Sequence, residues 1–310
     1  MYESYYGFSE KPFSLQTDPS LLYMGKAHSA AYTMLEYGIL NKAGFTVITG
    51  EVGSGKSTLL QKLLSNVQSD IVVGLVNNTN LNMGDLLPWV LHSFLQDYLV
   101  DNPIARYDVL NSFLEKQQKS GKRPVLIIDE AQNLPLDVLE ELRTLSNINS
   151  GKTQLLQIIL LGQPELREVL RKPQIRQFAQ RVTVDYHIPA LELAETSEYI
   201  GHRMELAGRS DPILDASACE LIHYVSGGVP RVINVICDTV LSYGFADQKQ
   251  QIDDVYVKGV LKERSEGGLL ALSRDPESYF KTKNKKKLGI DELIDQGMND
   301  GDFLFQDFDS

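Results

Sequence analysis

The feature that most restricts the fold of this chain is the stretch FTVITGEVGSGKSTLL at residues 45–60. It begins with a short β-branched apolar run and ends with apolar residues at helical spacing, so it predicts a strand, a loop and a helix in succession. The loop, GEVGSGKS, matches the pattern G-x-x-x-x-G-K-[ST]. Glycines without Cβ atoms let backbone N–H groups and the N-terminus of the next helix face an anion. The stretch therefore predicts a phosphate-binding loop.

The residue types in this loop predict ATP and Mg²⁺ as its ligands. Lys56 would neutralise the β- and γ-phosphates, and the Ser57 hydroxyl would bind Mg²⁺. An ordinary glycine turn before a helix would explain the glycines but not Lys-Ser at this spacing. The other residues expected to contact the nucleotide here are Gly50, Glu51, Val52, Gly53, Ser54, Gly55 and Thr58.

A second segment, PVLIIDEAQNL, ends an apolar run with Asp129 and Glu130. The carboxyl ends of strands are where doubly wound sheets bind ligands. Asp129 is expected to hold Mg²⁺ through its water shell, and Glu130 to orient and deprotonate the attacking water. Two acids after a strand are usually only the start of a loop, but downstream of the phosphate-binding loop they complete a catalytic pattern.

Between residues 45 and 190, short apolar runs alternate with longer amphipathic stretches, which is typical of a parallel sheet covered by helices on both faces. The predicted strands are 45–49, 71–76, 125–129, 157–162 and 182–188. The predicted helices between them lie near 56–66, 84–99, 104–119, 135–147 and 164–171.

After Pro189 no strand pattern recurs, and helix start signals take over. Thr196 is expected to cap a helix to about 207, Asp215 to open another to about 225, and Pro230 to begin a third to about 246. The predicted fold class is an α/β P-loop fold with a small all-helical domain. The expected domains are 1–190, 191–265 for the helical lid, and 266–310 for a lysine-rich linker and acidic tail.

The composition is consistent with a packed core, and much of the negative charge lies at the C-terminal end of the chain. Apolar residues make up 43% of the 310 residues, and the net charge is −11. The last twenty residues hold seven acids and no Lys or Arg, directly after the basic run KTKNKKK at 281–287. Such adjacent blocks are typical of a solvated, poorly ordered end. No signal peptide and no run of about 18 apolar residues occurs, so we expect a cytoplasmic protein without direct membrane insertion.

Together with LLGQPEL, GGVPR and the N-terminal YYGFSEKPFSLQTDPSLLY, these motifs resemble the AAA+ ATPases of the ExeA/general secretion protein A group. TnsC-type transposition ATPases are close to this group, and origin-recognition ATPases are more remote. The resemblance covers residues 1 to about 262. It implies a five-stranded sheet with the P-loop strand in a central position, a helical lid, and an active site completed by a neighbouring subunit.

The resemblance also implies roles for residues outside the two motifs. Gln163 takes the sensor-1 place, where it would contact the γ-phosphate or the lytic water; the alternative is a polar cap at a strand end. Arg231 matches the sensor-2 arginine of the lid; the alternative is a solvent-facing arginine. Arg176 and Arg181 are the two candidates for the arginine finger, with Arg181 preferred because it adjoins a predicted strand.

The N-terminal signature implies the adenine side of the pocket. Its members are Phe13, Asp18, Pro19 and Tyr23, although the two aromatic residues would serve equally well in a core.

Three hypotheses for the use of ATP remain open. In the first, a ring or filament of this chain binds double-stranded DNA through the loop at 77–85 and the lysines of 281–287. In the second, the chain serves secretion, pilus or polysaccharide assembly; relatives in that group commonly continue into a transmembrane segment and a peptidoglycan-binding domain, absent here, so we expect it to act from the cytoplasm through a partner. In the third, the chain binds ATP without turnover, which Glu130 argues against.

The acidic tail predicts a protein partner. Four large apolar residues interleave with the acids: Phe303, Leu304, Phe305 and Phe308. This composition favours docking on an apolar groove with a basic rim. The alternatives are an inhibitory contact with the chain's own lysines and a role in solubility alone.

Overall fold

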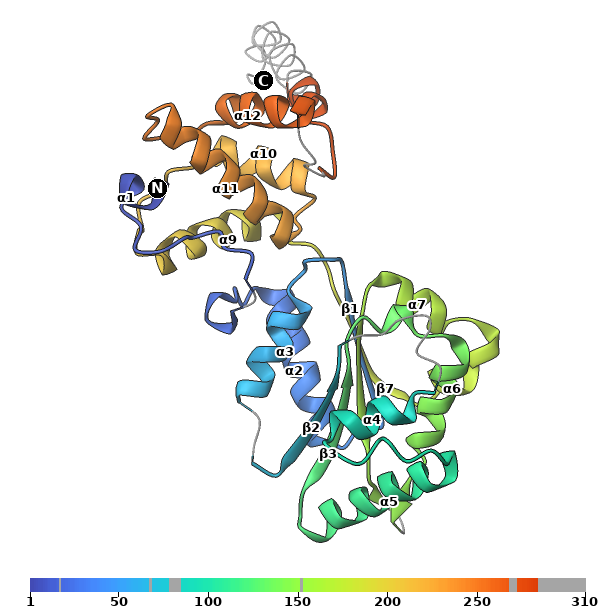
Figure 1. Cartoon of the computed structure of the whole chain (residues 1–310). Coiled ribbons are helices and arrows are strands. Elements are labelled where there is room, and N and C mark those ends of the chain that lie inside the picture. Colours follow the sequence, from blue (N-terminus) through green and yellow to red (C-terminus); the bar gives the residue numbers. More distant parts are fainter. Residues whose placement is uncertain (17, 67–68, 78–84, 151–152, 268–271, 284–310) are drawn as a thin grey trace, which may run out of the picture. The chain divides into compact units, whose positions relative to one another are not determined.

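The computed structural model describes residues 1–16, 18–66, 69–77, 85–150, 153–267 and 272–283 (Figure 1). By their contacts these residues form two compact units. One consists of Leu15–Ala190 with Val229–Arg231; the other consists of Met1–Ser14, Leu191–Gly228 and the described residues from Val232 onward. We describe each unit by itself.

The sheet unit contains a five-stranded parallel sheet of order β2-β3-β6-β1-β7. The phosphate-loop strand, β1, lies between β6 and the edge strand β7, so it is an inner strand, but the central strand is β6 and not, as the resemblance implied, the P-loop strand. The strands are β1 (Phe45–Gly50), β2 (Ile71–Val76), β3 (Arg123–Ile128), β6 (Gln157–Gly162) and β7 (Val182–Ile188). The predicted fold class is confirmed, and the strand bounds agree with those expected to within two residues.

Helices cover both faces of the sheet because the inner strands are apolar on both sides. On β3, Leu126 and Ile128 join one core and Ile127 joins the other. The helices α2 (Lys26–Leu40) and α3 (Lys56–Ser65) pack on one face. The other face carries α4 (Leu87–Ser93), α5 (Pro103–Lys119), α6 (Leu136–Leu145) and α7 (Pro164–Leu170).

Short elements complete this unit. A hairpin of β4 (Asn149–Ser150) and β5 (Thr153–Gln154) precedes β6. The remaining short helices are η1 (Pro19–Leu21), η2 (Ala131–Asn133), η3 (Pro173–Ile175) and α8 (Arg176–Ala179). Helix α4 is shorter than the predicted 84–99, because Leu95 adopts a left-handed backbone with φ 56° that a helix cannot continue through.

The helical unit contains α1 (Tyr2–Tyr6), α9 (Leu193–Leu206), α10 (Ala216–Ser226), most of α11 (Pro230–Ala246) and α12 (Asp254–Gly267). Residues 276–283 are also helical, although regular periodicity was not expected after residue 266. The predicted start of α10 is confirmed, since the Asp215 side chain accepts a hydrogen bond from the Ala218 N–H at 2.8 Å. Within the described ranges, none of the helices has both the length and the apolar character needed to cross a bilayer.

The prediction that Thr196 caps a helix was wrong. Helix α9 begins four residues earlier, at Leu193, because its N-cap is Glu192, which forms a reciprocal capping box with Glu195. Thr196 is fully buried inside the helix, and its hydroxyl pairs with His223 Nδ1 at 2.9 Å.

The first fourteen residues group with the helical unit, whereas the sequence analysis placed them with residues up to 190. The buried Arg203 of α9 donates to the carbonyl oxygens of Pro12 at 2.8 Å and Ser14 at 3.0 Å. Phe13, between these two residues, is 1% exposed and belongs to the core. These contacts hold the start of the chain on α9.

Candidate nucleotide-binding site

The phosphate-binding loop leaves β1 at Gly50 and enters α3 at Lys56. Gly53 and Gly55 have φ of 80° and 97°, a backbone region that glycine adopts with little cost. The Lys56 side chain is buried, and its ammonium donates to the carbonyl oxygens of Gly50 at 2.6 Å and Glu51 at 2.9 Å. The loop therefore wraps around the Lys56 ammonium at the N-terminus of α3.

The pKa of Lys56 is lowered overall, because burial outweighs the nearby carboxylates. Burial lowers the pKa of the ammonium, and the carboxylates of Glu130 and Asp129 act to raise it. A triphosphate in this loop would add negative charge beside the ammonium and favour its charged form further.

Ser57 and Asp129 bring together the oxygen atoms expected to hold a divalent cation. The Ser57 hydroxyl, in the first turn of α3, donates to Asp129 Oδ2 at 3.0 Å. Asp129 directly follows β3, and its N–H donates to the carbonyl of Val76 at 3.0 Å, which extends the sheet pairing by one residue. Hydroxyl and carboxylate oxygens are ligands that Mg²⁺ prefers, so these two residues fit the ion.

Glu130 lies beside Gln163 at the carboxyl edge of the sheet. Its backbone is left-handed, with φ 55°, and its N–H donates to Asp129 Oδ1 at 2.9 Å. Two amide groups donate to Glu130 Oε2: Gln132 Nε2 at 2.6 Å and Gln163 Nε2 at 3.1 Å. The structure thus brings together the two polar residues that the sequence placed at the ends of β3 and β6.

Arg231 and His28 support the loop from outside it. The Arg231 N–H donates to the Gly53 carbonyl at 3.2 Å, and a Cβ added at Gly53 would lie 2.3 Å from Arg231 Cβ. His28, buried on α2, donates from Nε2 to the Ser54 carbonyl at 2.7 Å. Any larger residue at position 53 would displace one of these contacts.

The remaining residues of the loop differ in their exposure. Ser54 is buried and Thr58 half-buried, whereas Glu51 and Val52 are exposed. Tyr23, in the predicted adenine-side segment, is half-buried. In the same segment Asp18 caps η1 by accepting from the Ser20 N–H, and Leu22 lies near the loop, 3.9 Å from a Cβ built at Gly55.

Arg176 and Arg181 lie at the opposite edge of the sheet from this loop. Val182, which follows Arg181, pairs with Phe45 at the start of β1, whereas Ile188 pairs with Gly50 at its end. Both arginines are exposed. The Arg181 guanidinium donates to Ser146 Oγ at 3.3 Å. Arg181 is therefore about six strand residues, roughly 20 Å, from its own phosphate-binding loop. Arg176 lies toward the same end of the strands, since Phe178 of its helix α8 packs against Phe45 at the start of β1.

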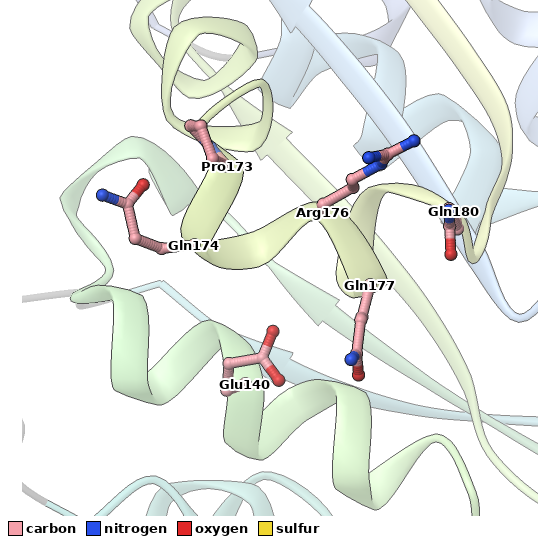
Figure 2. A pocket seen from close by; sticks show the side chains of 6 residues that line it. All are labelled: Glu140, Pro173, Gln174, Arg176, Gln177 and Gln180. Atoms are coloured by element: carbon pink, nitrogen blue, oxygen red, sulfur yellow. The ribbon is translucent and has the colours of Figure 1, made fainter.

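Arg176 lines a polar cavity of about 590 Å³. Figure 2 shows its guanidinium directed away from the carboxylate of Glu140, which pairs with Arg143 at 2.6 Å instead. The other residues lining the cavity are Pro173, Gln174, Gln177 and Gln180.

Several residues named for DNA or partner contacts lie outside the described part of the chain. These are the loop residues 78–84, Lys285, Lys286, Lys287 and the acidic tail. Lys281 is exposed, and Lys283 donates to Asp254 Oδ2 at 2.7 Å, a contact that raises the pKa of the lysine.

Two residues at the site escaped the sequence analysis. His28 carries no motif and lies 26 residues before its partner Ser54. Gln132 was visible within DEAQNL, and an amide two residues after a predicted catalytic glutamate is a signal that would have identified it.

Comparison with known proteins agrees with this geometry. A family described as an AAA domain matches residues 39–170. General secretion pathway protein A of Aeromonas hydrophila is 39% identical over 253 residues, which cover 81% of this chain and 46% of that protein. The chain thus spans less than half of this relative's length.

Solved structures share the fold. The Aeropyrum pernix ORC2 protein, in ADPNP-ADP complexes, has a TM-score of 0.60 at 20% identity and covers 82% of this chain and 72% of its own. Cdc6p of Pyrobaculum aerophilum has a TM-score of 0.62 at 14% identity, covering 81% and 70%. Drosophila ORC bound to DNA has a TM-score of 0.56 at 14% identity, covering 81% and 63%. With the match at 39–170, these findings show that the chain has the fold of AAA+ P-loop proteins and is similar to general secretion pathway protein A.

Proposed function

We propose that this chain binds ATP with Mg²⁺, hydrolyses it, and works as a nucleotide-controlled switch in a homo-oligomer. The observation that carries the proposal is the convergence of Lys56, Ser57, Asp129 and Glu130 at one edge of the sheet, with Ser57 Oγ 3.0 Å from Asp129 Oδ2. The Lys56 ammonium would exchange the carbonyls of Gly50 and Glu51 for phosphate oxygens.

Each residue has a separate task in this proposal. Ser57 and Asp129 would hold Mg²⁺, which when bound supplies positive charge beside the β- and γ-phosphates. Glu130 would orient the attacking water and accept its proton. Gln163 and Arg231 would contact the γ-phosphate, Arg231 from the first turn of α11. We propose residues 191–265, which include α11, as the helical lid. Tyr23 would contribute to the adenine side.

The place of the two arginines supports an oligomer. Neither Arg176 nor Arg181 reaches its own loop, because each lies at the other end of the parallel strands. We therefore propose that one of them enters the site of a neighbouring copy. Arg176 is the better candidate, since Arg181 already donates to Ser146 of its own chain.

For the biological role, we propose that the chain serves secretion or envelope assembly from the cytoplasm through a protein partner. The support is the 39% identity to a general secretion pathway protein. The DNA-binding alternative draws on the fold shared with Drosophila ORC bound to DNA. Against this alternative, Lys283 of the basic run 281–287 already donates to Asp254 of its own chain.

The test of ATP hydrolysis compares three variants with the native protein. Lys56→Ala should weaken ATP affinity by about 10- to 100-fold, the worth of a charge-assisted contact. Glu130→Gln should keep the affinity and lower turnover by about 10²- to 10⁴-fold. Lys62→Ala, on the same helix, serves as the control. If the native protein does not turn over ATP, only the hypothesis that the chain binds ATP without hydrolysing it remains.

The test of the role measures turnover with and without double-stranded DNA at two salt concentrations. We expect no effect of DNA. Stimulation that weakens at high salt would favour the DNA-binding alternative instead.

A further inference from the structure

Gln132 occupies a fixed position between the two halves of the proposed catalytic centre. It lies in η2, two residues after Glu130, and is half-buried. Its Nε2 donates to Glu130 Oε2 at 2.6 Å, and its Oε1 accepts from the backbone N–H of Gln163 at 2.9 Å. One side chain therefore links the end of β3 to the end of β6.

The orientation of this amide is determined by its partners. A backbone N–H only donates, so the atom of Gln132 that faces Gln163 must be the oxygen. The nitrogen must then face Glu130, where an ionised carboxylate only accepts. Exchanging the two atoms would break both hydrogen bonds, so the side chain has one stable arrangement.

The backbone around Gln132 is shaped for this contact. Glu130 adopts a left-handed conformation with φ 55°, which costs energy for a residue with a Cβ. Gly162 at the end of β6 leaves the space, since a Cβ there would lie 3.1 Å from Gln132 Oε1 and 2.8 Å from Leu166 Cδ2. The left-handed backbone of Glu130 and the missing side chain at Gly162 thus both make room for the Gln132 amide.

The two amides on Glu130 differ in what else they would do. The Gln163 side chain is proposed to contact the γ-phosphate, and its Nε2 would leave Glu130 when it does so. The Gln132 side chain has both ends occupied by groups of the fold and stays in place. Gln132 is therefore the contact that persists while the nucleotide changes.

We propose that Gln132 is the positioning residue of Glu130: it holds Oε2 in one direction and ties that direction to the backbone of Gln163. This inference rests on the proposed ATP hydrolysis at the same site. Gln132 itself touches neither water nor phosphate in this scheme. Its effect on the reaction comes from limiting the rotamers of a flexible glutamate, since supporting contacts of this kind keep a reacting group in its productive geometry.

The experiment uses the full chain and two substitutions. Gln132→Glu keeps the acceptor toward the Gln163 N–H, removes the donor toward Glu130 and places two carboxylates together. Gln132→Leu keeps the approximate size and removes both contacts. We expect each to lower kcat by about 10- to 100-fold, the usual effect of losing a supporting contact, while KM and the affinity for a fluorescent ATP analogue stay within about twofold. Asn133→Leu, one residue further in η2 and exposed, is the control and should leave kcat unchanged.

A double substitution tests the route of the effect. If Gln132 acts only through Glu130, adding Gln132→Leu to Glu130→Gln should cause no further loss of turnover. If Gln132→Leu lowers turnover by the same factor in the Glu130→Gln protein as in the native protein, Gln132 acts independently of Glu130 and the inference is overturned. Gln132→Asn, a shorter amide, should recover part of the loss.

The outcomes separate this inference from the function beneath it. A native protein that does not turn over ATP removes the proposed function. Native turnover together with unchanged or raised kcat in Gln132→Glu overturns only the positioning role. A parallel loss of kcat and nucleotide affinity, or a lower unfolding temperature that accounts for the loss, assigns Gln132 to structure and also overturns it.

Discussion

The two edges of the central sheet differ in how their polar side chains are used. At the carboxyl edge, Lys56, Ser57, Asp129 and Glu130 are hydrogen-bonded to loop carbonyls, to each other or to amides. At the amino edge, Arg176 is exposed and lines an open cavity. The difference teaches that one chain assembles the polar groups of its proposed nucleotide site at one end of the strands, whereas its candidate finger arginine lies toward the other end.

The largest expected effect is at the amino edge. Arg176→Ala should lower ATP turnover by about 10³-fold or more, since a finger arginine from a neighbour is worth about 10³–10⁵. ATP affinity should change little, because the native loop is intact. Steady-state turnover and analogue binding measure the two separately, and Arg171→Ala, an exposed arginine at the end of α7, is the control.

Mixing variants decides whether the arginine acts between copies. Arg176→Ala should turn over ATP slowly and Lys56→Ala should bind it weakly, but a mixed oligomer contains interfaces with one intact loop and one intact arginine. Recovered turnover on mixing supports action in trans. Loss of turnover in Arg181→Ala but not in Arg176→Ala would reassign the finger to Arg181.

A smaller effect is expected where α2 crosses β1 near the amino edge. A Cβ at Gly38 would lie 2.4 Å from Thr46 Oγ1, so Gly38→Ala should lower the free energy of unfolding by about 1–3 kcal/mol through overpacking. Turnover per folded molecule should not change. Denaturant titration measures the stability, and adding Thr46→Ala should restore part of it.

Gly201 provides a matched helical control. No atom lies within 4 Å of a Cβ built there, so Gly201→Ala should raise stability by up to about 1 kcal/mol through helix propensity. If Gly38→Ala behaves like Gly201→Ala, the close packing of α2 on β1 is incorrect.

The smallest effect concerns pH and returns to the carboxyl edge. His187 Nδ1 lies 3.1 Å from Thr49 Oγ1, and burial, followed by Arg167, lowers the pKa of this histidine. When the pKa of a histidine is lower in the folded state than in the unfolded state, the neutral ring favours folding. This contribution to the free energy of unfolding is complete above the unfolded pKa of about 6.5 and is lost as pH falls through the folded pKa. The free energy of unfolding should therefore fall between pH 7 and pH 5.5.

His187→Gln should make that fall shallower but not remove it. Burial also lowers the pKa of His223, so part of the slope persists. Titrations at fixed ionic strength measure both slopes. A slope equal to that of the native protein would show that His187 does not titrate in this range.

The sequence predicted the sheet better than the helices, for physical reasons. The inner strands are buried on both faces, and their apolar runs therefore stand out. The predicted start of α9 was wrong because threonine is a stronger N-cap residue than glutamate, whereas the pairing of Glu192 with Glu195 in the structure caps the helix four residues earlier. The short α4 depends on a left-handed leucine that no pattern marks.

For the site, the loop and the DEAQNL segment determined the identity of the binding groups, because each chemical task needs a particular residue type at a particular spacing. The tertiary structure alone decided which strand ends lie side by side and which oxygen of Glu130 accepts the amides of Gln132 and Gln163. It also decided that Arg176 and Arg181 lie toward the other end of the strands. Strand order and register bring together residues that are distant in the chain, and no local pattern carries that information.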